Sequence, residues 1–152
     1  MRVFQSAADL ADAVGEAIGP GPWHVVEQSR VDTFADATGD HQWIHTDPAR
    51  AADGPFGGTI AHGYLTLSLL PLLVRDLYRF EGARMVVNYG LNKVRFPAPV
   101  PVGASVHLTA RLVSVEEVPG GGVQVTAAMT IGTDRSDKPC CVAETVTRVF
   151  FA

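Results

Sequence analysis

The chain has 152 residues, of which 47% are hydrophobic and 18% charged, and its formal net charge is −4. This length fits one globular domain over residues 1–152, and the composition excludes a disordered chain. No cluster of Lys and Arg occurs, which argues against nucleic acid as a partner, although single cations could still contact a phosphorylated ligand.

The two cysteines, Cys140 and Cys141, are neighbours and form no spaced framework. Adjacent cysteines rarely bridge each other, so we expect reduced thiols in a cytoplasmic protein. The start, MRVFQSAADL, lacks a basic region followed by an apolar run and so does not resemble a signal peptide. The longest apolar stretch, within residues 59–80, contains a histidine, a proline and an arginine and is short for a membrane span.

The first predicted element is a helix. Ser6 with Asp9 three residues later is an N-cap pattern. Leu10, Val14 and Ile18 follow at helical spacing, and the GPGP motif after them ends the helix. A short strand is then predicted over residues 23–27.

A second helix is predicted from a further capping pair, Ser29 with Asp32, to a glycine stop at Gly39. The following segment, GDHQWIHTD at 39–47, is expected to be a loop. Asp47-Pro48 then predicts another short helix, because Asp is a good cap and Pro suits the first helical position.

One long helix is predicted over IAHGYLTLSLLPLLVRDLY at 60–78. The run is apolar on nearly every side, which is typical of a helix surrounded by protein. Pro71 removes one backbone hydrogen bond and predicts a kink there.

Four β-branched, partly alternating runs follow Gly82 and predict strands: RMVVNYGLNKVRF, SVHLTARLVSVEEV, GVQVTAAMTIGT and CCVAETVTRVFF. PGGG at 119–122 predicts a hairpin turn, and FPAPVPVG at 96–103 a rigid connection. Helices followed by strands indicate the α+β class. A strongly bent antiparallel sheet wrapped around one long apolar helix satisfies this order, and the short early strand can join it.

The expected loop carries the residues best suited to chemistry. If it folds back, Asp40 and His45 can hold one water between them and act as a general acid–base pair. This would suit adding or removing water across a carbon–carbon double bond. Gln42 could orient one member of the pair, and Trp43 with Ile44 would exclude bulk water.

Such a reaction needs a group that stabilises an enolate-like oxygen. Gly63 is expected in the first turn of the long helix, where backbone N–H groups lack intrahelical partners. These donors and the helix dipole favour a developing oxyanion, and glycine allows close approach of a ligand carbonyl.

Each residue also has a purely structural interpretation. An Asp in a loop often caps a turn, a lone His is often a satisfied core residue, and a Gly can serve packing alone. His41 and His45 stand four residues apart, but no further ligands are placed for a metal. Ser68 lacks a nucleophile elbow, and the two cysteines are expected to pack within a strand.

Beyond these local patterns, VDTFADATGDHQWIHTDPARAADGPFGGTIAHGYL at 31–65 resembles the hydratase signature of the MaoC-like, (R)-specific enoyl-CoA hydratase family. The signature has the shape F-A-x-x-[ST]-G-D-x-N-P-[IL]-H-x-D, followed by A, F-G and I-A-H-G. The matching residues are Phe34, Ala35, Thr38, Gly39, Asp40, Ile44, His45, Asp47, Phe56, Gly57, Ile60, Ala61, His62 and Gly63. NYGLNKVRFPAPVPVG and KPCCVAE extend the resemblance over most of the chain. It is strongest to single-domain actinobacterial 3-hydroxyacyl-thioester dehydratases, which are similar to nodulation protein N.

The resemblance implies a hot-dog fold and a homodimer whose sheets join edge to edge. It implies reversible hydration of trans-2-enoyl thioesters to (R)-3-hydroxyacyl thioesters without metal or redox cofactor, with CoA or acyl carrier protein as the substrate carrier. Asp40 and His45 take the positions of the family's catalytic pair, and Gly63 that of its thioester-binding glycine. The family's Asn-Pro is Gln42-Trp43 here, which puts the shape of the loop in question.

Other candidate residues follow from this hypothesis. Gln42 and His62 would support the geometry, Trp43 could narrow the acyl pocket, and Tyr64 and Leu65 would line the acyl tunnel. Arg84, Lys93 and Arg95 are candidates for the CoA phosphates but are also explained as exposed strand charges.

Two alternative functions stay open. A hot-dog thioesterase would use the same fold and thioester but place its carboxylate differently, and it would release free CoA thiol. A non-catalytic acyl-thioester binding module would be expected to lose the Asp or the His, and this sequence keeps both.

Overall fold

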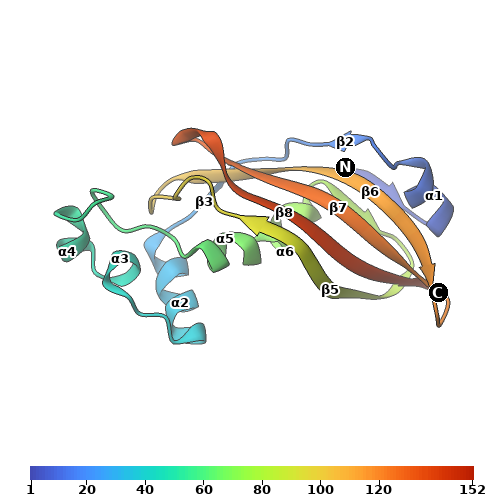
Figure 1. Cartoon of the computed structure of the whole chain (residues 1–152), viewed down its shortest axis with the longest axis horizontal. Helices are drawn as coiled ribbons and strands as arrows, with labels where there is room; N and C mark the ends of the chain where they lie inside the picture. The colour runs from blue at the N-terminus through green and yellow to red at the C-terminus, as the bar shows by residue number, and fades with distance from the viewer.

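The structure is a computed structural model that describes all of residues 1–152. Its main element is a six-stranded antiparallel sheet of order β2-β6-β7-β8-β5, with β3 also paired to β6. The strands are β2 (Ala17–Ile18), β3 (His24–Val25), β5 (Ala83–Arg95), β6 (Ser105–Val118), β7 (Gly122–Thr133) and β8 (Ser136–Phe151). Figure 1 shows the long strands curving across two central helices, so the predicted α+β architecture is confirmed.

The expected long helix is present as two consecutive segments, α5 (Gly63–Ser68) and α6 (Leu70–Arg75). Pro71 lies in the first turn of α6, where its missing N–H removes one bond of the helical ladder, so the helix is interrupted next to the residue at which a kink was predicted. The prediction of one helix over 60–78 is wrong at both ends. Ile60 bridges Pro101 in an extended conformation, and β4 (Tyr78–Phe80) pairs in parallel with β1 (Arg2–Phe4).

The first helix is shorter than its apolar spacing predicts. In α1 (Ala7–Asp12), the Ser6 hydroxyl accepts the N–H of Asp9 at 3.2 Å, which confirms the N-cap. The helix ends at Asp12, and Ile18 pairs with Ala110 of β6 instead of continuing it. Hydrogen bonds to the edge of the sheet therefore override the helical spacing in this segment.

The second helix, α2 (Gln28–Thr38), begins before the predicted Ser29 cap, and Glu27 at its N-cap makes no side-chain bond. Gly39 ends it with φ 79°, as predicted. The expected loop contains a single helical turn, α3 (Trp43–Thr46), so the prediction of an irregular loop is wrong there.

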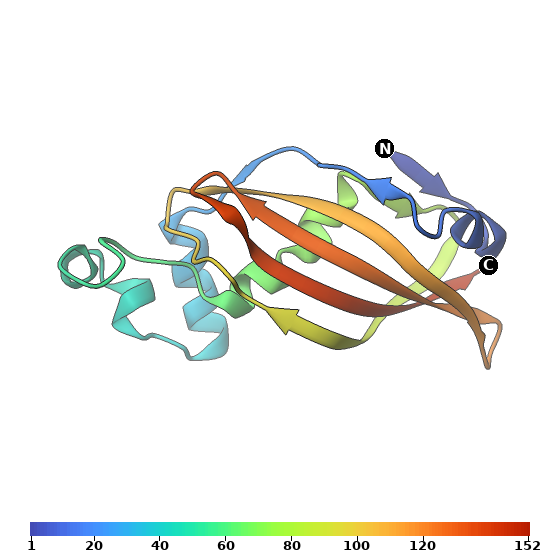
Figure 2. The ribbon, with the colours of Figure 1, turned by 45° about the horizontal axis from the view of Figure 1, so that its top comes forward.

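Asp47 caps the next helix, α4 (Pro48–Ala52), by accepting the N–H of Arg50 at 3.1 Å, as predicted. Figures 1 and 2 show α2, α3 and α4 at one end of the sheet and both chain termini at the other. None of the helices is long and apolar enough to cross a membrane.

The hydrophobic core is one cluster of 27 buried residues between the sheet and the central helices. Leu65, Leu69 and Leu73 recur at four-residue spacing and contribute one buried stripe from α5 and α6. This packing fixes the start of α5, and hence Gly63, relative to the segment that carries Asp40 and His45.

Candidate functional site

The structure brings Asp40, His45 and His62 together, although 22 residues separate the first from the last. One ligand atom from each lies within 4.8 Å of the others. Asp40 follows the Gly39 helix stop, His45 lies in α3, and His62 is the N-cap residue of α5. The predicted catalytic pair and the predicted supporting histidine therefore form one cluster.

Hydrogen bonding fixes the tautomer of His45. Its ring is 7% exposed, and Nδ1 lies 2.7 Å from the carbonyl oxygen of Ile60. Because a carbonyl only accepts, Nδ1 of neutral His45 carries the proton and donates it. Nε2 then has a free lone pair, so it can accept a hydrogen bond or a proton from a water.

His62 holds Asp40 in place through the main chain. Its Nε2 donates to the Asp40 carbonyl oxygen at 3.0 Å, and its ring stacks on His45 with centroids 3.9 Å apart. Phe34 of α2 packs against the His62 ring at 4.9 Å. The ring is 3% exposed and its Nδ1 has no hydrogen-bond partner. These contacts support the predicted positioning role of His62.

The Asp40 carboxylate is exposed, and the backbone N–H of Gln42 approaches its Oδ1 at 3.4 Å. Gln42 itself is exposed, and it contacts the pair through its main chain, since its carbonyl accepts the N–H of His45 at 3.0 Å. Trp43 is half-buried, with the Arg50 guanidinium 4.4 Å above its ring. The indole therefore packs on α4, and the structure does not place it in an acyl pocket.

Gln28 is a supporting residue that sequence reasoning missed. Its side-chain amide donates to the carbonyl oxygen of His45 at 2.7 Å and to Asp32 at 2.9 Å. Its Oε1 accepts the hydroxyl of Thr59 at 2.6 Å. No motif marks this residue, because its partners lie 17 and 31 residues away and meet it only after folding.

We expect Gln28→Leu to lower kcat by about fivefold, since the loss of one supporting hydrogen bond costs roughly 1 kcal/mol and lets His45 shift. Gln28→Glu keeps the acceptor for Thr59 but loses the donor to His45, so it separates the two contacts. The test compares the steady-state kcat of wild type and both variants with one enoyl thioester. Thermal unfolding of each variant is measured as well. Wild-type kcat in both variants would contradict this role.

Gly63 is the first residue of α5, and its N–H therefore lacks an intrahelical acceptor. A Cβ built on it would lie 3.0 Å from Cδ2 of Phe96, closer than side chains normally pack. Only glycine leaves both the ring and the backbone of this turn undisturbed, which fits the predicted approach of a ligand carbonyl.

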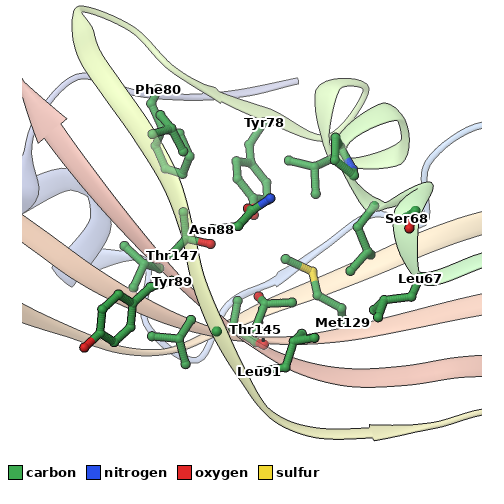
Figure 3. Close-up of a pocket in the computed structure, with 18 residues that line it drawn as sticks. Leu67, Ser68, Tyr78, Phe80, Asn88, Tyr89, Leu91, Met129, Thr145 and Thr147 are labelled. Atoms are coloured by element: carbon green, nitrogen blue, oxygen red, sulfur yellow. Dashed lines mark hydrogen bonds between the residues drawn. The ribbon is translucent and has the colours of Figure 1, made fainter. Parts of the chain in front are cut away.

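A cavity of about 500 Å³ lies beside the central helices and is lined by Leu67, Ser68, Leu70, Pro71 and Val74 from that part of the chain (Figure 3). Its helical lining begins one turn after Gly63. The predicted tunnel residues lie elsewhere: Tyr64 is 73% exposed and Leu65 is buried in the core. The difference is one of position along the helix axis, because the cavity begins one turn after Tyr64, at Leu67 and Ser68.

The three candidate phosphate contacts lie on β5 and are exposed. Arg95 precedes Phe96, which contacts Gly63, so Arg95 and the nearby Lys93 lie at the end of β5 closest to the cluster. Arg84 lies at the other end, roughly 35 Å away along an extended strand. Arg84 therefore lies far from Lys93 and Arg95, with which it was predicted to contact the CoA phosphates.

His41 does not complete a metal site with its neighbours. Its Nε2 lies 2.9 Å from Asp36 on the surface of α2. This hydrogen bond raises the pKa of His41, which favours the protonated ring, and a protonated ring cannot bind a metal. Asp40, His45 and His62 each offer one atom that could bind a metal ion. The expectation that the protein uses no metal stays a prediction.

Comparison with known proteins shows extensive similarity. The family model described as "MaoC like domain" matches residues 9–133. The 3-hydroxyacyl-thioester dehydratase Z of Mycobacterium tuberculosis is 57% identical over 148 residues, which cover 97% of this chain and 98% of that protein. Nodulation protein N of Rhizobium leguminosarum bv. viciae is 41% identical over 150 residues, covering 96% and 92%.

Solved structures share the fold at lower identity. A MaoC-like dehydratase from Rhodospirillum rubrum has a TM-score of 0.74 and 23% identity, covering 92% of this chain and 94% of that one. An R-hydratase from Pseudomonas aeruginosa has a TM-score of 0.71 and 22% identity, covering 96% and 86%. These likenesses confirm the predicted hot-dog fold.

Proposed function

Because the chain belongs to the MaoC-like domain family, we propose that it is an (R)-specific enoyl-thioester hydratase, or 3-hydroxyacyl-thioester dehydratase. It would reversibly add water to trans-2-enoyl thioesters. The main structural support is the cluster in which the Asp40 carboxylate lies beside the His45 ring, whose Nδ1 is hydrogen-bonded to the Ile60 carbonyl so that Nε2 is left for a water. The dehydratase name of the 57% identical relative supports the same reaction.

In this proposal, one water donates hydrogen bonds to the Asp40 carboxylate and to Nε2 of His45. As the water oxygen bonds to C3 of the enoyl group, His45 takes a proton from the water and delivers it to C2. The Asp40 charge activates the water and stabilises the transient imidazolium. The Gly63 N–H donates to the thioester oxygen, where negative charge develops.

This chemistry needs no redox cofactor, because adding water to a double bond neither oxidises nor reduces the substrate overall. We further propose that no metal takes part, since His45 and Asp40 supply the proton transfers themselves. Activity should therefore be unchanged after exhaustive treatment with a chelator.

The direct experiment follows the enoyl-thioester absorbance when purified protein meets crotonyl-CoA, and then a longer trans-2-enoyl-CoA. Loss of absorbance with formation of the (R)-3-hydroxyacyl product supports the proposal. Release of CoA thiol, detected with a thiol reagent, would favour a thioesterase instead. If no enoyl-CoA and no enoyl-acyl carrier protein gives either loss of absorbance or release of thiol, a non-catalytic binding module is favoured.

The protein's own thiols should not disturb that assay. Cys140 and Cys141 are buried, and burial raises their pKa values to about 12 and about 11. Both therefore stay protonated and shielded near neutral pH, where the thiolate is the reactive form. Two unpaired thiols also fit the proposed cytoplasmic location.

We propose that the protein forms a homodimer through β5. This strand pairs only with β8, so its other edge is free. Met85, Val86, Val87, Tyr89 and Leu91 on it are each between 39% and 58% exposed. A long apolar sheet edge is a natural template for pairing with a second copy.

We expect the double variant Met85→Glu with Val87→Glu to be monomeric, because both side chains lie on the same side of the strand and would repel their counterparts. Light scattering coupled to size exclusion measures the mass. Val113→Glu, at a residue 45% exposed on β6, is the matched control and should keep the dimer. A monomeric wild type would contradict the proposed interface.

The remaining proposals concern the carrier and the domain. Lys93 and Arg95 lie at the end of β5 near Gly63, which supports contact with the phosphates of CoA or of an acyl carrier protein. One hydrophobic core supports treating residues 1–152 as a single domain.

A further inference from the structure

The 500 Å³ cavity lies between α5, α6 and strands β4, β5, β7 and β8. Twelve of its eighteen lining residues are hydrophobic, and none carries a charge. Such walls suit an apolar chain, and they supply no counter-ion for a carboxylate or a phosphate.

The cavity has a near end and a far end relative to Gly63. Leu67 and Ser68 form the near end, about 6 Å beyond Gly63 at the rise of an α-helix. Tyr78 and Phe80 of β4 lie on the opposite side, as Figure 3 shows. An acyl chain whose thioester lies at Gly63 would therefore need several carbons to reach the far end.

Tyr78 presents an unusual polar group at that end. It is 5% exposed, and its ring packs edge-on against Phe4 at 5.7 Å and Phe80 at 5.5 Å. Burial alone raises its pKa to about 12, with no hydrogen bond from the chain contributing, so the hydroxyl stays protonated. Tyr78 lines the cavity and its hydroxyl is not fully enclosed by the chain, so a polar group on a ligand could reach it and supply a hydrogen bond.

Two further polar side chains line the same cavity. Asn88 of β5 and Thr147 of β8 are direct partners in the sheet, so their side chains project from the same face. Both line the cavity and lie on the Tyr78 side of it in Figure 3. The near end differs, because the hydroxyl of Ser68 already donates to the Tyr64 carbonyl at 2.7 Å.

We propose that the far end of this cavity binds a neutral oxygen, a hydroxyl or a keto group, on the distal part of the acyl chain. The substrate class is then a medium-length enoyl thioester oxygenated near its terminal carbon. Tyr78 is the specificity-determining residue, and Asn88 and Thr147 contribute further polar contacts. This inference rests on the proposed function and narrows its substrate.

The test compares trans-2-enoyl-CoA thioesters of eight and ten carbons, each with and without a hydroxyl on the terminal carbon. The measured quantity is the ratio of kcat/KM for the hydroxylated to the plain substrate at each length. For the wild type we expect a ratio of about ten at one of the lengths, the effect of one net hydrogen bond.

Tyr78→Phe should bring that ratio close to one, and Thr147→Val, which preserves the side-chain shape, should lower it. Ser68→Ala removes a hydroxyl from the near end and should keep the wild-type ratio. A wild-type ratio at or below one at both lengths, or a ratio unchanged in Tyr78→Phe, would overturn the inference while hydration of the plain substrates still supports the proposed function. No hydration of any thioester would remove the proposed function and the inference together.

Discussion

Asp40→Asn is expected to lower kcat for enoyl-thioester hydration by about 10²–10⁴-fold, the usual contribution of one positioned acid–base group. The amide keeps the size of the carboxylate but removes the charge that activates the water. Rates of absorbance loss with one saturating enoyl-CoA measure the effect. The fold should be unaffected, because the carboxylate is exposed and receives only a long 3.4 Å hydrogen bond from Gln42.

His45→Gln should lower kcat by a similar factor, but its ring is buried and stacks on His62, so unfolding must be measured beside activity. Asp36→Asn is the matched control, since it removes an exposed carboxylate that binds His41 outside the cluster. It should keep near wild-type activity. Normal rates in Asp40→Asn would show that this carboxylate is not part of the reaction.

Gly63→Ala is expected to lower kcat/KM by about 10²-fold, the scale of an ångström-sized misplacement in an active site. The new methyl group would lie 3.0 Å from the Phe96 ring and would crowd the approach of the thioester to the Gly63 N–H. Initial rates over a range of enoyl-CoA concentrations separate the effect on kcat from that on KM.

A second variant distinguishes the two causes. Gly63→Ala combined with Phe96→Leu gives the methyl group room on the side of the ring. If the loss persists in this double variant, the methyl group blocks the substrate. If activity returns, the loss came only from displacement of Phe96, and the proposed contact with the thioester oxygen would lose its support.

The residues proposed to carry the chemistry could be singled out from the sequence alone, because they fall within one continuous segment. Asp40 and His45 lie five residues apart, and Gly63 opens the apolar run that follows. Four β-branched runs after an apolar helix likewise determined the α+β class. Side-chain period and turn residues are local properties, so they are readable before folding.

The predictions that failed did so where distant segments compete for the same backbone. Ile18 continues a helical spacing but pairs with Ala110, and Tyr78 ends an apolar run but pairs with Arg2. In both cases the hydrogen bonds of a neighbouring strand decide the conformation. No local pattern contains that information.

The tertiary structure alone decided how the site is held and what it could select. Gln28 reaches His45 and Thr59 across 17 and 31 residues, and Tyr78 faces a cavity whose walls come from two helices and four strands. The sequence determined which chemical groups are present and their order along the chain. Their distances, tautomers and unpaired hydrogen-bonding atoms exist only once packing brings separate segments together.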